Sequence, residues 1–242
     1  MQKINNLLDT LNTISPFDLQ ESWDNSGLIL GSRNDEFSNI YLSLEVDRNI
    51  LESIPKDSVL ITHHPLIFSP LKQIDFESYP SSLLKIAIQK NIKLIAMHTN
   101  FDKTHFGKYV VRKLLKIDSF NQDGFVVYFS WDSNLDSLCY KLKESLKIQT
   151  LKITKSSQNC KNIALVTGSG ASFVRSLSNV DCLITGDIKY HEAMEAMERN
   201  INLIDCGHYE LECYFGEILA DILTNYGYKA IIFDSKNPFY FL

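Results

Sequence analysis

Three clusters of histidine and carboxylate residues each follow a short apolar run of the kind that forms a buried strand. The clusters hold, in chain order, His63 and His64, then His98 and Asp102, then His208 and Glu212. In α/β sheets, sites form at the carboxyl ends of the strands. Imidazole nitrogens and carboxylate oxygens bind divalent transition metals and also carry protons in catalysis. The pattern therefore predicts a metal or proton-transfer site.

Each cluster also has a plainer interpretation. In an extended segment the side chains of His63 and His64 would leave on opposite faces. At a loop start they can instead straddle a point between two metal ions, and the plainer alternative is a solvated loop with two surface histidines. Asp102 is a ligand or the cap of a helix expected from 105. His208 and Glu212 stand one turn apart on one helix face, where Glu212 binds an ion or complements the helix dipole.

Taken together, the clusters favour two metal ions over one. Three imidazoles and two carboxylates exceed what one ion needs, whereas two ions about 3.5–4 Å apart would use all five. The ligand types fit Zn, Fe, Mn, Ni or Co without choosing among them. The five predicted ligands are His63, His64, Asp102, His208 and Glu212.

A fourth segment, Thr185-Gly-Asp-Ile-Lys-Tyr-His-Glu-Ala193, also follows an apolar run. If Gly186 opens a helix, its amide groups and Lys189 suit a phosphate; the alternative is a capped surface helix. Thr167-Gly-Ser-Gly170 lacks the Walker and dinucleotide patterns, so it is either a turn or a backbone approach to a ligand.

Strand and helix patterns alternate along the chain, which predicts an α/β fold with mostly parallel or mixed sheets. The composition change near 121–124 suggests a domain boundary. Strands are expected at 40–46, 59–62, 92–97, 124–130, 162–166, 181–185, 201–205 and 229–233. Helices are expected at 3–14, 81–90, 105–115, 135–146, 188–199 and 210–225, and a short helix after the first strand ends at about 54.

Composition excludes several classes of protein. The 242 residues carry 24 Lys+Arg and 29 Asp+Glu, and the net charge of −5 argues against a protein that mainly grips nucleic-acid phosphates. No apolar run approaches the length of a membrane span. The five cysteines form no CxxC pair, which favours free thiols and a cytoplasmic location.

Four segments together resemble the signature blocks of one family. The four segments are 61–70 (ITHHPLIFSP), 98–102 (HTNFD), 186–193 (GDIKYHEA) and 207–212 (GHYELE). The earlier segment Trp23-Asp-Asn-Ser-Gly-Leu28 matches the same family. They resemble, in order, those of the GTP cyclohydrolase 1 type 2 family, also called NGG-one-interacting factor three-like. The blocks cover nearly the whole chain.

The resemblance implies two similar α/β domains, the second inserted into the first, in a toroidal homohexamer. The expected domains are 1–122 with 208–242, which would bind the metals, and the inserted 123–207. The family's ligand positions fall on the five residues chosen above, with two divalent ions such as zinc per subunit. The resemblance places His98 close by, as a group that contacts the ligands or the substrate. From residue type and position, His98 is a candidate proton carrier, and Lys189 and Gly186 are candidate phosphate contacts.

The implied reaction is hydrolytic opening of the purine imidazole ring of GTP, giving formate and 7,8-dihydroneopterin triphosphate. A water activated by metal, with acid and base groups to move protons, suits that reaction. Two alternatives stay open from the sequence: a metal-storage, metal-delivery or regulatory hexamer without nucleotide chemistry, and an adaptor or nucleic-acid-binding ring. The charge argues against the last of these.

Overall fold

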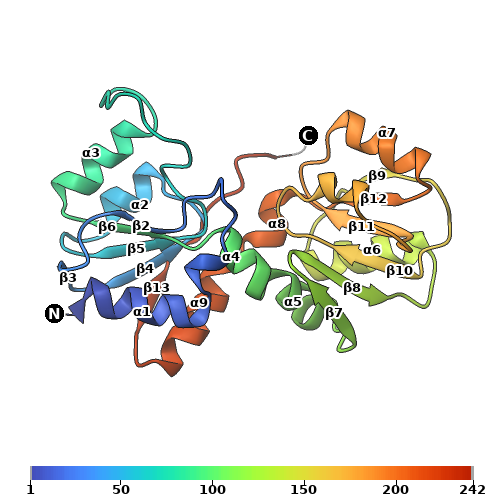
Figure 1. The fold of residues 1–242 in the computed structure, drawn as a ribbon, viewed down its shortest axis with the longest axis horizontal. Helices are drawn as coiled ribbons and strands as arrows, with labels where there is room; N and C mark the ends of the chain where they lie inside the picture. The colour runs from blue at the N-terminus through green and yellow to red at the C-terminus, as the bar shows by residue number, and fades with distance from the viewer. Residues whose placement is uncertain (1, 241–242) are drawn as a thin grey trace. The chain divides into compact units, whose positions relative to one another are not determined.

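The structure, a computed structural model, describes residues 2–240. The chain forms two compact units (Figure 1). Unit 1 comprises Met1–Phe101 and Cys213–Leu242, and unit 2 comprises Asp102–Glu212. Unit 2 is thus one continuous segment inserted between two segments of unit 1. Each unit is built on a mixed sheet of its own, which confirms the α/β fold.

Unit 1 contains a five-stranded sheet in the order β13-β4-β5-β6-β2. The strands are β2 (Gly27–Leu30), β4 (Ile40–Ser43), β5 (Val59–Thr62), β6 (Lys93–Ala96) and β13 (Ala230–Ile232). Only β2 is antiparallel to its neighbour. A two-stranded ribbon of β1 (Gln2–Lys3) and β3 (Glu36–Phe37) lies apart from this sheet.

Helices cover both faces of this sheet, which is why β4, β5 and β6 are buried throughout. Figure 1 shows α2 and α3 on one face and α1 and α9 on the other. The helical elements of unit 1 are α1 (Ile4–Ile14), η1 (Phe17–Leu19), α2 (Arg48–Ser53), α3 (Ser81–Gln89), α4 (Thr99–Phe101) and α9 (Phe215–Asn225).

Local sequence explains where these helices begin and which side they bury. In α1, the apolar residues Ile4, Leu7, Leu8 and Leu11 recur at helical spacing and are all buried. The carboxylate of Asp47 starts α2 by accepting a hydrogen bond from the Ile50 amide at 2.8 Å.

Unit 2 contains a six-stranded sheet in the order β7-β8-β10-β11-β12-β9. The central strands β10, β11 and β12 run parallel, and antiparallel strands flank them on both sides. The strands are β7 (Phe120–Asp123), β8 (Val126–Ser130), β9 (Lys152–Thr154), β10 (Asn162–Leu165), β11 (Cys182–Thr185) and β12 (Asn202–Asp205).

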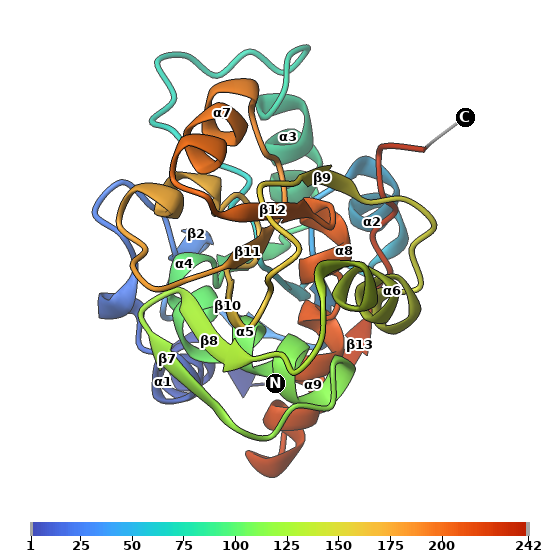
Figure 2. The ribbon, with the colours of Figure 1, turned by 90° about the vertical axis from the view of Figure 1, so that its right-hand side faces the viewer.

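The helices of unit 2 lie on both sides of its sheet, with α7 and α6 on opposite faces in Figure 2. Short helix η4 packs with α7 over the parallel strands, where Val174 and Ala196 meet Leu183 and Leu203. The helical elements here are η2 (Asp102–Phe106), α5 (Gly107–Tyr109), η3 (Val110–Leu114), α6 (Leu135–Leu146), η4 (Ala171–Arg175), α7 (Tyr190–Glu198) and α8 (His208–Glu212).

The predicted helix 105–115 begins earlier than expected. Its first residue is Thr99, whose backbone amide donates to the Asp24 carboxylate at 3.0 Å. Asp102 therefore does not cap this helix. It lies inside the helical run, at the first residue of the π-helical segment η2, and π-helical turns are frequent at functional sites.

The unit boundaries differ from the domain boundaries expected at 122/123 and 207/208. The chain passes between units at 101/102 and 212/213, because the segment after Phe101 packs on the sheet of unit 2. A side-chain carbon at Gly107 would lie 2.5 Å from Val127 Cγ2. Gln122 Nε2 also donates to the Lys103 carbonyl at 2.7 Å.

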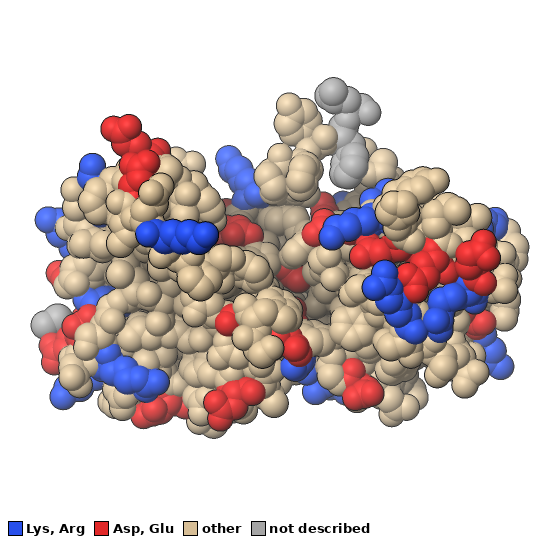
Figure 3. All heavy atoms as spheres, turned by 45° about the horizontal axis from the view of Figure 1, so that its top comes forward, with Lys and Arg blue, Asp and Glu red and all other residues tan. Residues whose placement is uncertain are grey.

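The surface drawn in Figure 3 mixes Lys and Arg with Asp and Glu over each unit. This face therefore carries no stripe of a single charge sign, in keeping with the net charge of −5. Within residues 2–240, no helix is both long enough and apolar enough to cross a bilayer.

A buried amide holds one edge of unit 2 together. Asn202 is fully buried, and its side-chain oxygen accepts from the amides of Ser156 (2.8 Å) and Ser157 (3.0 Å). Its Nδ2 donates to the carbonyls of Asn159 and Asp181, both at 3.1 Å. All the hydrogen-bonding capacity of this side chain is therefore used.

We expect Asn202→Ala to lower the free energy of unfolding by about 3 kcal/mol, because several buried groups lose their partner at once. Urea unfolding followed by circular dichroism measures the change. The exposed Asn121 on β7 supplies the control, and Asn121→Ala should change the free energy of unfolding by less than about 0.5 kcal/mol. Equal effects of the two substitutions would contradict this account.

Candidate metal centre

Three histidines converge at one edge of the sheet of unit 1. His63 and His64 follow β5 directly and His98 follows β6, and these two strands are parallel neighbours with Thr62 opposite Ala96. One ring nitrogen from each of the three lies within 4.8 Å of the other two. The structure thus brings together the histidines of the first two predicted clusters, as strand order requires.

Each of these histidines uses its Nδ1 atom to contact a fixed oxygen. His63 Nδ1 lies 2.8 Å from the Met97 carbonyl, His64 Nδ1 2.5 Å from Glu45, and His98 Nδ1 2.7 Å from Asp24. Because a carbonyl or carboxylate oxygen only accepts, each Nδ1 carries the proton and donates it. The Nε2 lone pair of the neutral ring then remains for a metal.

Asp24 is the most strongly stabilised carboxylate of unit 1. Burial alone would raise its pKa, but hydrogen bonds from His98 and Thr99 outweigh burial and hold the pKa well below the usual range. Its side chain is fully buried and also accepts from the Ser26 hydroxyl at 3.0 Å. Asp24 therefore remains charged and orients His98.

Unit 2 carries a second set of predicted ligands. His208 Nε2 lies 2.9 Å from Glu212 Oε2, and the two residues stand one turn apart on α8, as their spacing predicts. His208 Nδ1 contacts Asp187 Oδ2 at 2.6 Å, which repeats the arrangement found in unit 1. The hydroxyl of Thr167 donates to Asp102 Oδ1 at 3.2 Å.

Two glycines make room for this second set. Gly168 has φ +62°, and a side-chain carbon there would lie 2.4 Å from Glu212 Oε1 and 3.5 Å from His208 Nε2. A side-chain carbon at Gly186 would lie 2.6 Å from the His208 amide nitrogen. The Thr167-Gly-Ser-Gly170 segment is therefore a turn that admits the Glu212 carboxylate.

The donor set fits divalent transition-metal ions. All four imidazoles, those of His63, His64, His98 and His208, direct Nδ1 to a carbonyl or carboxylate oxygen. This is the usual arrangement around metal-binding histidines, since the partner fixes the tautomer and the ring orientation. Carboxylate oxygens from Asp102 and Glu212 are the harder ligands that such ions also accept.

Sequence reasoning missed the partners of the histidines. Asp24 and Asp187 lie in segments that carry the family resemblance, but nothing in their spacing showed which imidazole each would meet. Asp187 adopts φ +54° and turns its carboxylate to His208. Glu45 follows β4 and gave no signal of its own.

The remaining candidates take other positions. Lys189 is exposed at the start of α7, where its amide donates to Glu192 Oε2 at 2.9 Å. His191 is exposed on the same helix, with its ring 5.4 Å from that of Tyr190. Burial and the nearby Asp205 raise the pKa of the Cys206 thiol well above its usual value, so this thiol stays protonated.

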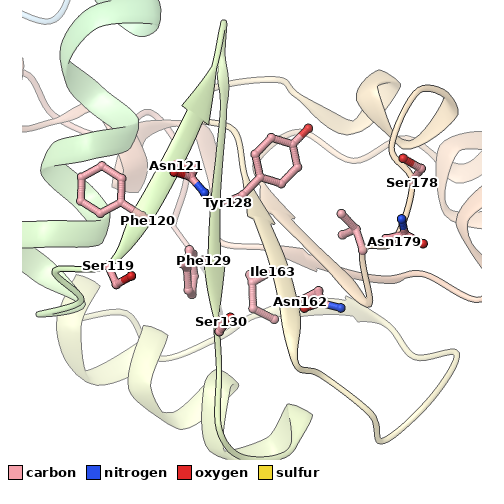
Figure 4. Close-up of a pocket in the computed structure, with 11 residues that line it drawn as sticks. Ser119, Phe120, Asn121, Tyr128, Phe129, Ser130, Asn162, Ile163, Ser178 and Asn179 are labelled. Carbon is pink, nitrogen blue, oxygen red and sulfur yellow. The ribbon is translucent and has the colours of Figure 1, made fainter.

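Unit 2 also contains a polar pocket of about 240 Å³. Figure 4 shows its lining residues, which come mainly from β7, β8 and β10 and include Asn121, Tyr128 and Asn162. Asn162 begins β10, whereas Thr167 and Gly168 follow the end of that strand. The pocket and the predicted ligands of unit 2 therefore lie at opposite ends of the parallel strands.

Comparison with known proteins decides the family. The family model for Duf34/NIF3 (NGG1p interacting factor 3) matches residues 2–238. The chain belongs to this family. A Helicobacter pylori protein named GTP cyclohydrolase 1 type 2 is 48% identical over 98% of each chain. A Campylobacter jejuni protein named as a homologue of GTP cyclohydrolase 1 type 2 is 42% identical, again over 98% of both chains. The family resemblance of the sequence is thereby confirmed.

Solved structures show the same fold. A Staphylococcus aureus hypothetical protein, SA1388, superposes with a TM-score of 0.87 at 25% identity, over 99% of both chains. Reduced HcgD from Methanocaldococcus jannaschii gives 0.82 at 21% identity, covering 97% of this chain and 98% of its own. At that identity HcgD shows the fold alone.

Gly168 offers a direct test of the second ligand set. We expect Gly168→Ala to weaken zinc binding by about tenfold or more, because the added methyl group displaces the Glu212 carboxylate. Gly124 is the matched control: it also has a positive φ (+54°), but a side-chain carbon there meets nothing within 4 Å. Calorimetric titration with zinc should show nearly unchanged affinity in Gly124→Ala. If zinc affinity fell equally in both variants, backbone strain alone would explain the loss, and the role of Gly168 in the ligand set would be contradicted.

Proposed function

We propose that this protein is a metal-dependent hydrolase that opens the imidazole ring of GTP or a closely related purine nucleotide. The observation that carries the proposal is the set of four histidines whose Nδ1 atoms all contact carbonyl or carboxylate oxygens. The names of the relatives at 48% and 42% identity supply the reaction class.

Two divalent ions are proposed to bind His63, His64, Asp102, His208 and Glu212. The five residues divide between the units, with His63 and His64 in unit 1 and the other three in unit 2. Within unit 1, the ring of Phe215 lies 5.0 Å from that of Phe101 and 5.7 Å from that of His63.

Asp102 follows Phe101 directly, and Glu212 precedes Phe215 by three residues. Three residues span at most about 11 Å, and adjacent Cα atoms lie about 3.8 Å apart. Chain connectivity therefore only limits how far the backbone of the two carboxylate residues can lie from Phe101 and Phe215.

When bound, such ions supply Lewis acidity and a water molecule that ionises near neutral pH. The protein's own residues orient the metal ligands and move protons during the reaction. The Met97 carbonyl, Glu45 and Asp187 hold the ligating imidazoles in one tautomer. His98 is proposed to carry protons during ring opening, since its Nδ1 is held by Asp24 and its ring lies 5.0 Å from that of His63.

Lys189 and the Gly186 turn remain proposed phosphate contacts. The exposure of Lys189 leaves its ammonium group available to an anion. Gly186 backs onto the main chain of Gly207 and His208, and its amide donates to the Gly168 carbonyl at 2.8 Å, so the contact with phosphate is proposed mainly for Lys189.

The assembly and location belong to the same proposal. We expect a cytoplasmic homohexameric ring, with free cysteines and the family resemblance as support. Sedimentation equilibrium on purified protein should give a mass near six chains, and a monomer at micromolar concentration would contradict the ring.

Purified protein loaded with zinc, manganese, iron, cobalt or nickel in turn should release formate from GTP, and chelation should stop the release reversibly. His63→Ala should reduce the rate by roughly a hundredfold or more, since it removes a ligand rather than a ligand's partner. The exposed His191 supplies a control, because His191→Ala should retain the rate.

Circular dichroism checks that His63→Ala is folded, and Asp187→Asn gives a second, milder variant with metal affinity lowered roughly 10–100-fold. Formate release that survives chelation would contradict the metal role. Absence of formate with every metal, combined with tight and stoichiometric binding of ions, would favour a metal-storage or delivery function instead.

A further inference from the structure

Two large aromatic side chains of unit 1, which would ordinarily be buried, are exposed on its surface. Trp23 is 57% and Phe68 is 50% exposed. They come from different loops, before β2 and after β5, yet their rings lie 5.8 Å apart at an interplanar angle of 53°. This is the separation of an ordinary aromatic pair, so the two rings form one continuous apolar surface.

This surface borders the histidines of unit 1. The ring of His98 lies 6.2 Å from Trp23 and 6.0 Å from Phe68, edge-on to both. His98 is in turn 5.0 Å from His63 and 5.3 Å from His64, again measured between ring centroids. A flat group that stacks on one of these rings, with the other ring tilted against it at 53°, would lie next to the proposed proton carrier.

Hydrogen bonds hold the two loops in place. Next to Trp23, the Asp24 carboxylate contacts His98 and Thr99. Asn25 Nδ2 donates to the Ile67 carbonyl at 2.6 Å, which ties the loop of Trp23 to that of Phe68. The backbone on both sides of the surface is thus fixed before any ligand arrives, and a fixed surface loses little conformational entropy on binding.

We propose that Trp23 and Phe68 are the contact surface for the planar base of the nucleotide, with His98 at the edge of that base. This inference rests on the proposed function and specifies how its substrate is held. Two rigid rings suit a flat heteroaromatic group, because every base offers a π-face for stacking. Because His98 lies beside the rings, the surface favours a base that reacts there over a purely apolar partner.

Binding is measured with a pair of probes that differ by the base alone, GMP and ribose 5-phosphate. The chain has two tryptophans, so the substitution Trp131→Phe leaves Trp23 as the sole tryptophan emitter. In that variant GMP should quench the fluorescence saturably, and ribose 5-phosphate should leave it unchanged. Absence of saturable quenching by GMP would overturn the proposal.

Calorimetry then measures GMP binding in variants of otherwise native protein. Trp23→Ala and Phe68→Ala should raise the Kd roughly ten- to hundredfold, whereas Trp23→Phe, which keeps a flat ring, should stay within a few-fold. Phe76 is the matched control: it is an exposed phenylalanine on the same loop as Phe68, and Phe76→Ala should bind GMP as the native protein does.

The outcomes separate this inference from the proposed reaction. GMP binding that depends on Trp23, in protein that never forms formate, would support the surface and contradict the hydrolase. Formate release with an unchanged KM in Trp23→Ala would support the hydrolase and contradict the contact surface. A change of oligomeric state in Trp23→Ala with unchanged GMP affinity would assign the rings to a contact between copies of the chain and overturn the proposal.

Discussion

The contact of each imidazole Nδ1 with a carbonyl or carboxylate oxygen is the interaction on which the rest of the site depends. A free histidine interconverts between tautomers and titrates near pH 6.5. Here the Met97 carbonyl, Glu45, Asp24 and Asp187 each accept a hydrogen bond from the protonated Nδ1 of one histidine. Every ring is thereby oriented, and the lone pair of its other nitrogen is available to a cation.

The fold supplies these oxygens through its strand ends. His63, His64 and His98 follow adjacent parallel strands, and their partners come from the end of β4, from the Trp23-to-Ser26 loop and from the main chain after β6. Unit 2 has the same arrangement, in which His208 at the start of α8 contacts Asp187 in the turn after β11. Glycines at 168 and 186 permit the close backbone approach, because any side chain there would collide with Glu212 or the His208 main chain.

The sequence predicted the central strands well because their signal is local. Val59–Thr62 forms a strand with the expected bounds, and Leu135–Leu146 forms the expected helix. The antiparallel strands Gly27–Leu30, Phe120–Asp123 and Lys152–Thr154 were missed, since they are short and none of their residues is buried.

The candidate ligands were predictable for the same reason, because histidine and carboxylate pairs directly follow readable strands. Their partners were not, because Asp24 meets His98 across 74 positions of the chain and Asp187 meets His208 across 21. Such pairing depends on tertiary structure that no local pattern encodes. The exposed pair of Trp23 and Phe68 was equally invisible, since loop spacing says nothing about ring contact.

The most direct test of the account is a crystal structure of the zinc-loaded protein with anomalous data collected at the zinc absorption edge. The account predicts two anomalous peaks about 3.5–4 Å apart, bonded by the Nε2 atoms of His63, His64 and His208, with each Nδ1 still on its carbonyl or carboxylate partner. Peaks at Nδ1 atoms, or zinc bound away from these residues, would contradict it.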